Sequence, residues 1–341
     1  MRTVDLVLLG LGNVGKAFVR LAHEKRGFCR DRYGLDFRLR AALATGGGFA
    51  ADPISHPEGL AERPAVPAGE RAASPEWTAG LRLEDALAAA PRGVVIECTP
   101  TDIRSGQPGL DHMRLALSRG WHVAAASKGG LVTDLPGLRR LAKDRGVALK
   151  YSGATAAALP TLDVGQVALS GAEVTKIEGI LTGVTNLILS RMEAGGSFES
   201  ALAEAQAMGI AEPDPSLDID GWDTACKILL IANTVAGTEF RLADVVRQGI
   251  RHVRPEDIAA ARAAGRTLKL VGRYTRDGQS ERIEVGVSAL GPEHPLCGVS
   301  GTNKAIAYVT DTMGTVFVSG GKSDPRGTAA SVLKDIINIF G

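Results

Sequence analysis

The stretch VDLVLLGLGNVGKAFVRLA, Val4 to Ala22, places a glycine-rich turn between two different apolar patterns. Before the turn, the continuous run VDLVLLG indicates a buried strand, and after it VGKAFVRLA has the spacing of a helix. The turn itself, GLGNVG, fits the pattern G-x-G-x-x-G. Gly10 would allow the tight turn, Gly12 would let the backbone approach a pyrophosphate, and Gly15 would let the helix pack on the strand.

This turn predicts a dinucleotide site, because the free N–H groups and the dipole at a helix N-terminus favour phosphate. We therefore predict that NAD or NADP binds through five residues of the turn, Gly10, Gly12, Asn13, Val14 and Gly15. The choice between the two cofactors stays open, with NADP slightly favoured. The second strand ends in Ala44-Thr45-Gly46, without the acid that would bind the ribose 2′-hydroxyl of NAD, and no arginine follows directly for a 2′-phosphate.

The pattern of apolar residues changes near Tyr151. Before it, apolar runs at residues 39–45, 93–99, 122–127 and 147–153 alternate with helical patterns at 110–120 and 135–146, which predicts βαβ units and a parallel sheet. After it, residues 174–181, 281–290 and 304–310 alternate like antiparallel strands, with helical patterns at 186–195, 198–209 and 222–235 between them. An amphipathic helix over 328–340 closes the sequence.

We therefore expect an α/β protein with a Rossmann-type nucleotide-binding domain over residues 1–150, rejoined by the C-terminal helix at about 326–341. An inserted α+β domain over residues 151–325 would bind substrate and form a dimer sheet.

Composition narrows the partners. The 341 residues include 39 Lys and Arg and 38 Asp and Glu, a formal net charge of +1, which favours neither nucleic acid nor an anionic membrane as a partner. No apolar run approaches the roughly 18 residues of a spanning helix. The N-terminal residues read as a strand rather than a leader. The four cysteines are far apart and without CxxC spacing, so we expect neither a disulfide framework nor a zinc site. A reducing, cytoplasmic location is expected instead.

A second chemical signal lies in the acid-rich stretch AEPDPSLDIDGWDTACKILL, residues 211–230. Asp223 and Lys227 are four residues apart and share a helix face, and the apolar residues after them indicate a buried helix. A lysine held there beside carboxylates could act as a general acid/base, since burial and neighbours tune its pKa. An exposed ion pair would show the same spacing.

The stretch DPSLDIDGWDTACKILLIA resembles the signature of the homoserine dehydrogenase family, in which an acidic DPxxDxxGxDxxxK segment leads into the catalytic helix. The resemblance implies that Lys227 is the acid/base residue and that Glu212 and Asp223 bind the amino-acid substrate. Asp218 matches a further acid of that site. Carboxylates suit the ammonium group of such a substrate. The implied reaction is the reversible NAD(P)-dependent reduction of L-aspartate 4-semialdehyde to L-homoserine, in threonine and methionine biosynthesis.

The resemblance extends over nearly the whole chain. The segment ECTPTDIRSGQPGLDHMRLALSRGWHVAAASKGGLV is similar to the family's surroundings of the nicotinamide, which implies that Thr99 and Pro100 line the cofactor. Lys128 matches a lysine near cofactor and substrate, and is our second candidate catalytic residue. The segment YSGATAAALPTL resembles a crossover whose backbone carbonyls can hold a monovalent cation, here at Thr155 and Ala157. A homodimer is also implied.

Several positions depart from the family pattern. Ser152 stands where Glu is common, Ser127-Lys128 replaces Asn-Lys, and Thr182 and Val184 replace a polar pair in LTGVTN. The glycine-rich segment GGKSDPRGTA carries extra charges, and the appended regulatory domain of longer relatives is not expected.

These departures leave other functions open. They include a paralogous dehydrogenase of another small amino or hydroxy acid, and a non-catalytic NAD(P)-binding regulator. Aspartate-semialdehyde dehydrogenase is less favoured, because Cys98 would have to serve as its nucleophile.

Overall fold

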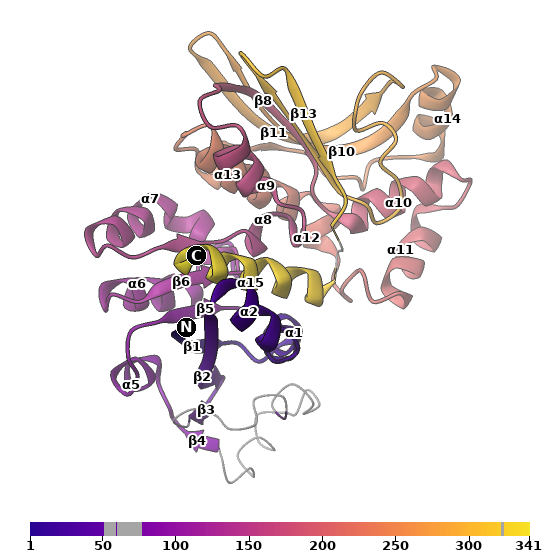
Figure 1. Cartoon of the computed structure of the whole chain (residues 1–341). Coiled ribbons are helices and arrows are strands. Elements are labelled where there is room, and N and C mark those ends of the chain that lie inside the picture. The colour runs from indigo at the N-terminus through magenta and orange to yellow at the C-terminus, as the bar shows by residue number, and fades with distance from the viewer. Residues whose placement is uncertain (51–58, 60–76, 322–323) are drawn as a thin grey trace. The chain divides into compact units, whose positions relative to one another are not determined.

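The computed structural model describes residues 1–50, 59, 77–321 and 324–341. The chain forms two compact units, shown in Figure 1. Unit 1 comprises Met1–Ala154 and Pro325–Gly341, and unit 2 comprises Thr155–Asp324. The domain boundaries expected from the sequence, after residue 150 and before residue 326, lie close to these crossings. The sequence is rich in glycine and proline from Gly46 to Pro75, and most of this passage lies outside the described residues.

Unit 1 is built on a seven-stranded sheet with the order β4-β3-β2-β1-β5-β6-β7. Its strands are β1 (Arg2–Leu9), β2 (Leu35–Ala44), β3 (Gly47–Ala50), β4 (Trp77–Ala79), β5 (Val94–Glu97), β6 (His122–Ala125) and β7 (Leu149–Lys150). Strand β1 pairs in parallel with both β2 and β5, and β6 and β7 continue the parallel part. Strands β3 and β4 extend the other edge in antiparallel pairing. The predicted Rossmann-type fold is confirmed.

The helices of unit 1 are α1 (Asn13–Glu24), α2 (Arg26–Tyr33), α5 (Leu83–Ala88), α6 (Gly109–Ser118), α7 (Gly129–Asp144) and α15 (Pro325–Phe340). The helix expected from residue 135 is the second part of a longer element. Helix α7 begins at Gly129 and is interrupted at Asp134, whose φ of −151° and ψ of 54° are not helical. The Asp134 carboxylate accepts the N–H of Gly137 at 2.9 Å, so this residue caps a new helical start, as an N-cap does.

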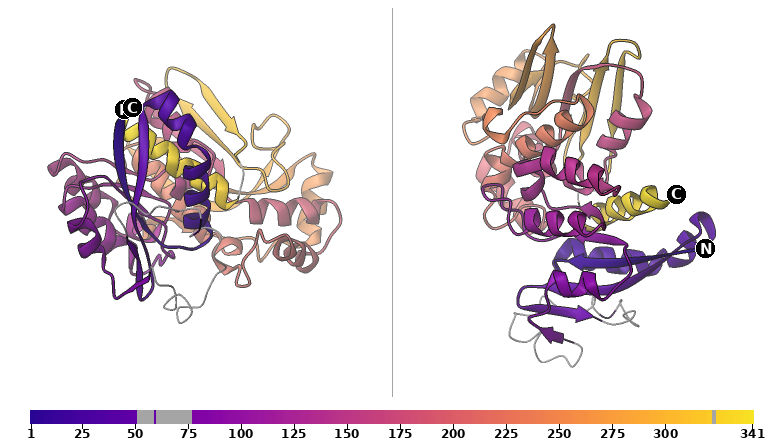
Figure 2. Two further views of the ribbon diagram at one scale, coloured as in Figure 1. Left: turned by 60° about the horizontal axis from the view of Figure 1, so that its bottom comes forward. Right: turned by 90° about the vertical axis from the view of Figure 1, so that its left-hand side faces the viewer.

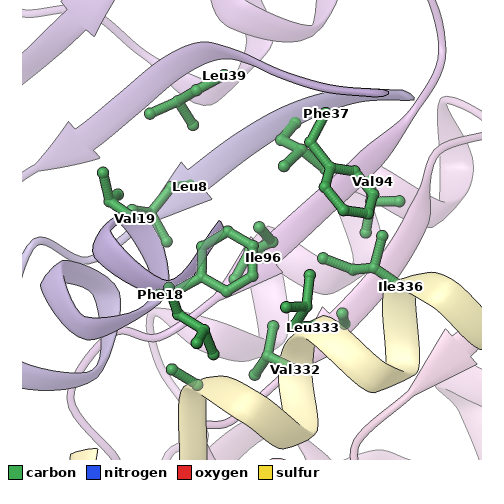
Figure 3. Close-up of a cluster of buried hydrophobic side chains, with 14 of the residues drawn as sticks. Leu8, Phe18, Val19, Phe37, Leu39, Val94, Ile96, Val332, Leu333 and Ile336 are labelled. Carbon is green, nitrogen blue, oxygen red and sulfur yellow. The ribbon is translucent and has the colours of Figure 1, made fainter. Parts of the chain in front are cut away.

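The C-terminal helix completes the core of unit 1. Buried side chains from α1, β1, β5 and α15 form one cluster, drawn in Figure 3, to which α15 contributes Val332, Leu333 and Ile336. Both views of Figure 2 show this yellow helix beside the indigo N-terminal segment. The predicted apolar face of the last helix is confirmed for these three residues, and Ile337 and Phe340 are partly buried against the same cluster.

Unit 2 contains a six-stranded sheet with the order β13-β12-β8-β10-β11-β9. Its strands are β8 (Val174–Ile180), β9 (Val246–Arg247), β10 (Thr267–Asp277), β11 (Ser280–Leu290), β12 (Ala305–Thr310) and β13 (Thr315–Ser319). Pairing is antiparallel except between β9 and β11. The three strands predicted here correspond to β8, β11 and β12. Strand β10 was not predicted from the sequence, because Lys269 and Arg273 interrupt its apolar pattern.

Helices of unit 2 are α9 (Thr161–Asp163), η1 (Val164–Ala168), α10 (Gly183–Glu193), α11 (Phe198–Ala207), α12 (Ser216–Ile219), α13 (Trp222–Val235), η2 (Leu242–Asp244) and α14 (Pro255–Ala263). The short helix α8 (Gly153–Ala156) spans the residue at which the chain passes from one unit to the other. Helix α13 packs closely on the sheet at Gly272, where a Cβ would lie 3.1 Å from side-chain carbons of both Thr224 and Ile228. Among the described residues, no helix is long and apolar enough to cross a membrane.

Candidate active site

The predicted dinucleotide turn lies where β1 ends and α1 begins. Gly10 has φ of +96°, and a Cβ there would lie 2.5 Å from the carbonyl oxygen of Cys98 on the neighbouring strand end. A Cβ on Gly15 would lie 2.0 Å from the carbonyl oxygen of Gly10. Both glycines are therefore required by the packing of the turn itself. A Cβ on Gly12 would meet nothing within 4 Å, so this side of the turn is open.

The open side of the turn suits a phosphate group. Gly12 is the N-cap of α1 and caps no N–H through a side chain, and the first turn of the helix carries no acid. Asn13 is exposed and Val14 half-buried. The first N–H groups of a 12-residue helix thus lie beside unfilled space, with the helix dipole favouring an anion. These features fit the pyrophosphate of a dinucleotide.

The predicted nicotinamide residues lie at the same edge of the parallel sheet. Thr99 and Pro100 follow β5, and Lys128 follows β6 as the N-cap of α7. The amide of Cys98 donates to the carbonyl of Leu9 at 2.8 Å, which places the end of β5 beside the glycine-rich turn. Carboxyl ends of neighbouring parallel strands form the cofactor edge in this kind of fold. Unit 1 therefore gathers the predicted cofactor residues at one edge.

A buried carboxylate that the sequence reading missed organises this edge. Glu97, the last residue of β5, is fully buried and accepts hydrogen bonds from the Thr99 amide at 2.8 Å and the Ser127 hydroxyl at 3.2 Å. The Thr99 hydroxyl also donates to it, and Nδ1 of His112 lies 2.8 Å from its other oxygen. Glu97 therefore joins the ends of β5 and β6. Its signal in the sequence is an acid that ends an otherwise apolar strand.

Cys98 has the wrong environment for a nucleophile. Desolvation, together with the negative charge of Glu97, raises the pKa of the Cys98 thiol. A thiol is nucleophilic as the thiolate, which a raised pKa disfavours. This observation weighs further against the chemistry of a cysteine-dependent semialdehyde dehydrogenase.

In unit 2, Lys227 and Asp223 form a mostly buried ion pair on helix α13. The Lys227 Nζ lies 2.5 Å from the Asp223 carboxylate, and the two side chains are only 14% and 15% exposed. Lys227 also donates to the carbonyl of Leu181 at 2.9 Å. The alternative of an exposed surface pair is thus excluded by burial. An ammonium has three donors, so one remains for a substrate oxygen.

The other predicted acids of this region differ in their surroundings. Asp218, on α12, accepts a hydrogen bond from the Thr182 hydroxyl at 2.9 Å, and Thr182 follows Leu181 directly. The departure at Thr182 therefore retains a polar contact with the predicted site. Glu212 is exposed in the loop after α11, and no described hydrogen bond or ion pair links its carboxylate to Asp223 or Lys227. Hydrogen bonds to the adjacent residues Leu181 and Thr182 thus link Lys227 and Asp218. Glu212 takes no part in these hydrogen bonds.

Two further acids of the loop have structural partners. The Asp214 carboxylate accepts the Ser216 amide at 3.1 Å and so shapes the turn before α12. From the sequence, Asp214 and Asp220 are predicted to shape this loop and cap the helix after it. The cap is wrong for Asp220, because Gly221 is the N-cap of α13 and Asp220 pairs with Arg251.

The expected cation segment lies at the start of unit 2. Thr155 is fully buried, with its hydroxyl 2.7 Å from that of Thr161, and Ala157 has a φ of +52°. The carbonyl between them, of Ala156, accepts the Nζ of Lys304 at 2.6 Å. An ammonium group therefore already lies on the backbone where an alkali cation was expected. A cation bound at the Ala156 carbonyl would have to displace this amino group, so the surroundings of that carbonyl do not fit one.

Ser152, which replaces a common Glu of the family pattern, belongs to a different network. Its amide and hydroxyl donate to the buried Asp335 carboxylate at 2.8 and 2.7 Å, and Lys334 donates to its hydroxyl at 2.9 Å. This residue thus ties the end of the parallel sheet to α15. The described residues hold no cluster of three or more His, Cys, Asp or Glu side chains suited to a metal ion.

The Rossmann-type unit with its glycine-rich turn defines the class of NAD(P)-dependent oxidoreductases, and comparison with known proteins narrows it. Residues 160–337 match the family model of homoserine dehydrogenase. The chain belongs to the homoserine dehydrogenase family.

Similarity to individual relatives covers the whole chain. It is 32% identical to a homoserine dehydrogenase of Methanocaldococcus jannaschii, over 99% of this chain and 98% of the relative. It is 31% identical to an NAD(+)-dependent homoserine dehydrogenase of Pseudomonas canavaninivorans, over 99% of this chain and 97% of the relative. A crystal structure of a provisionally named homoserine dehydrogenase from Archaeoglobus fulgidus superposes with a TM-score of 0.87 at 30% identity, covering 99% of each chain.

Proposed function

We propose that the protein catalyses the reversible NAD(P)-dependent reduction of L-aspartate 4-semialdehyde to L-homoserine. Family membership supports this activity, and the observation that carries it is the buried pair of Lys227 and Asp223, 2.5 Å apart, with Lys227 also bound to the Leu181 carbonyl. Two fixed acceptors hold the ammonium in one orientation and leave one donor for the reacting oxygen. A surface ion pair has no need of that arrangement.

Unit 1 would hold the cofactor. The N–H groups at Gly12, Asn13 and Val14 would bind its pyrophosphate, and Thr99 and Pro100 would line the nicotinamide, with Glu97 fixing the Thr99 backbone. When bound, the nicotinamide supplies the hydride for the carbonyl carbon or accepts it in the reverse direction.

The preference for NADP over NAD, which differ in the phosphate on the ribose 2′ position, remains a prediction. Strand β2 ends at Ala44, and the next residues, Thr45 and Gly46, carry no acid for a ribose 2′-hydroxyl. A relative carries the description NAD(+)-dependent. Parallel kinetic measurements with NAD and NADP would decide the preference.

Residues of unit 2 would bind the substrate and move the proton. In the direction of reduction, Lys227 would donate a proton to the carbonyl oxygen, and in oxidation it would accept the hydroxyl proton. Asp223 would orient Lys227 and, with Glu212 and Asp218, attract the substrate ammonium. Glu212 would meet the substrate ammonium from the exposed loop after α11. Lys128 would support the reacting end of the substrate.

Replacement of Lys227 tests this proposal. We expect Lys227→Met to lower kcat for NAD(P)-linked oxidation of homoserine by about 10³-fold, a typical contribution of a general acid/base. Lys143→Met removes an exposed lysine at the end of α7 and should retain activity. Equal rates for the Lys227 variant and wild type would contradict the role, and strong turnover of another alcohol with negligible homoserine activity would identify a different substrate.

Two further proposals concern the state of the protein. A homodimer formed through the sheet of unit 2 remains a prediction, to be tested by sedimentation equilibrium. A cytoplasmic location is supported by the four cysteines, none of which forms a disulfide in the described part of the chain.

A further inference from the structure

A buried lysine outside the predicted catalytic set lies directly before strand β12 of unit 2. This residue, Lys304, is only 2% exposed. No sequence motif includes it. Its Nζ donates to the Ala156 carbonyl at 2.6 Å, and that carbonyl also accepts the amide of Leu159 at 3.2 Å. Burial of a lysine costs free energy unless its amino group is hydrogen-bonded or paired with an opposite charge.

The segment held by Lys304, residues 155–161, runs from the end of α8 through a turn to the start of α9. Ala157 has a positive φ of 52°, which is unusual for a residue with a Cβ. Strand β12 also holds the far end of the turn, because the Tyr308 hydroxyl donates to the Thr161 carbonyl at 2.7 Å. The Lys304 amino group thus holds this backbone near one end, and the Tyr308 hydroxyl holds it at the other.

The same lysine lies within the electrostatic field of the predicted catalytic pair. Burial and the positive charge of Lys227 lower the pKa of Lys304 to about 7, while Asp223 and Asp324 act in the opposite direction. Any change in the charge or position of Lys304 therefore acts on the surroundings of the pair as well as on the turn.

We propose that Lys304 is a positioning residue that takes the place of a bound alkali cation, with its amino group holding residues 155–161 through the Ala156 carbonyl. The protein then requires no sodium or potassium ion at this turn. A tethered amino group is always present at its site, whereas a free ion must bind from solution. The structural part of this proposal stands apart from the proposed function, and only its kinetic readout rests on it.

The test compares three forms of the protein in three salts. Wild type, Lys304→Ala and Lys269→Ala are melted at equal ionic strength in NaCl, KCl or tetramethylammonium chloride, whose cation is too large to take the place of the Lys304 amino group. Lys269 is the matched control, since it is a buried lysine of the same unit, on β10, 1% exposed and beside Glu193. The kcat and KM for homoserine are measured in the same buffers.

We expect the Tm of wild type to be equal in the three salts. Lys304→Ala should melt lower in tetramethylammonium and regain about 3 °C in NaCl or KCl, with saturation as the ion fills the vacated space. Its kcat should recover in parallel. Lys269→Ala should lose the same stability in every salt.

Three results would overturn the proposal. One is a wild-type Tm that depends on sodium or potassium, and another is a Lys304→Ala defect that is identical in all salts, which a merely structural lysine would give. The third result is that Lys304→Ala stays unfolded in all three salts. Absence of homoserine turnover in wild type would count against the proposed function and leave the melting comparison intact.

Discussion

At the scale of single residues, the largely buried lysines Lys227 and Lys304 are held by contacts of very different separation along the chain. Asp223 and Lys227 were predicted to share a helix face, and they form a pair that is largely shielded from solvent. Glu97 and Lys304 could not be recognised in the same way, because their partners are distant along the chain. The contact between Lys304 and Ala156 joins residues 148 positions apart. Such contacts follow from the sheet topology rather than from any local pattern.

The lowered pKa of Lys304 predicts a dependence of stability on pH. Its pKa of about 7 in the folded chain lies below the ordinary 10.5 of the unfolded chain, so between these values the unfolded chain binds more protons and stability rises with pH. Relative to Lys304→Met, the free energy of unfolding of wild type should increase by up to about 2 kcal/mol from pH 6 to pH 9. Urea denaturation at several pH values measures this difference.

The comparison with Lys304→Met cancels the titration of other groups that the two forms share. The charged groups that act on Lys304, namely Lys227, Asp223 and Asp324, are present in both proteins. A difference in stability that stays constant over this pH range would show that Lys304 keeps an ordinary pKa in the folded chain.

At the scale of elements, helix α13 depends on one close approach to the sheet. It spans Trp222–Val235, as the sequence predicted, because a run of helix-compatible apolar residues follows the αL turn at Gly221. What the sequence did not predict is the strand beneath it, β10, where Gly272 leaves room for Thr224 and Ile228. The glycine lets the helix that carries Lys227 lie against the sheet.

Gly272→Ala should therefore disturb the site through α13. The added methyl would lie 3.1 Å from two side chains of the helix, which we expect to cost about 1–3 kcal/mol of stability and to lower kcat as Lys227 shifts. Gly286→Ala, on the neighbouring strand β11, is the matched control, because its Cβ would meet nothing within 4 Å. Denaturation and homoserine kinetics on both variants test this, and equal behaviour would exclude the close approach as a constraint.

At the scale of the whole molecule, the alternation of patterns predicted the fold class, and the return of the last helix to the N-terminal sheet was expected together with the family resemblance. The antiparallel extension by β3 and β4 was not predicted, since the two strands are short and border the Gly/Pro-rich passage. The exact pairing order of the second sheet was also beyond local patterns, because β8 pairs with β10 and β12, both far along the chain.

The last helix provides a test at this scale. Ile336→Ala removes a fully buried side chain from the core of unit 1 and should cost about 2–5 kcal/mol. Asn338→Ala, exposed on the same helix, should change stability little. Hydrogen exchange should show the loss of protection in β1 and β5, which share the cluster with α15. Equal loss throughout unit 2 would instead mean that the two units unfold as one.

The insertion of unit 2 into unit 1 has a consequence for the order of folding. Arg326 pairs with Glu24 across 302 positions of sequence, so α15 must join a partner that is very remote along an unfolded chain. The ends of unit 2 are adjacent, because a Cβ on Gly321 would lie 2.6 Å from the amide of Leu159. Once unit 2 has folded, its residues 155–324 act as a short connection, so the loop that α15 closes is roughly halved and its entropic cost falls by roughly 0.7 kcal/mol. Early folding of the inserted unit would thus accelerate completion of the nucleotide-binding one.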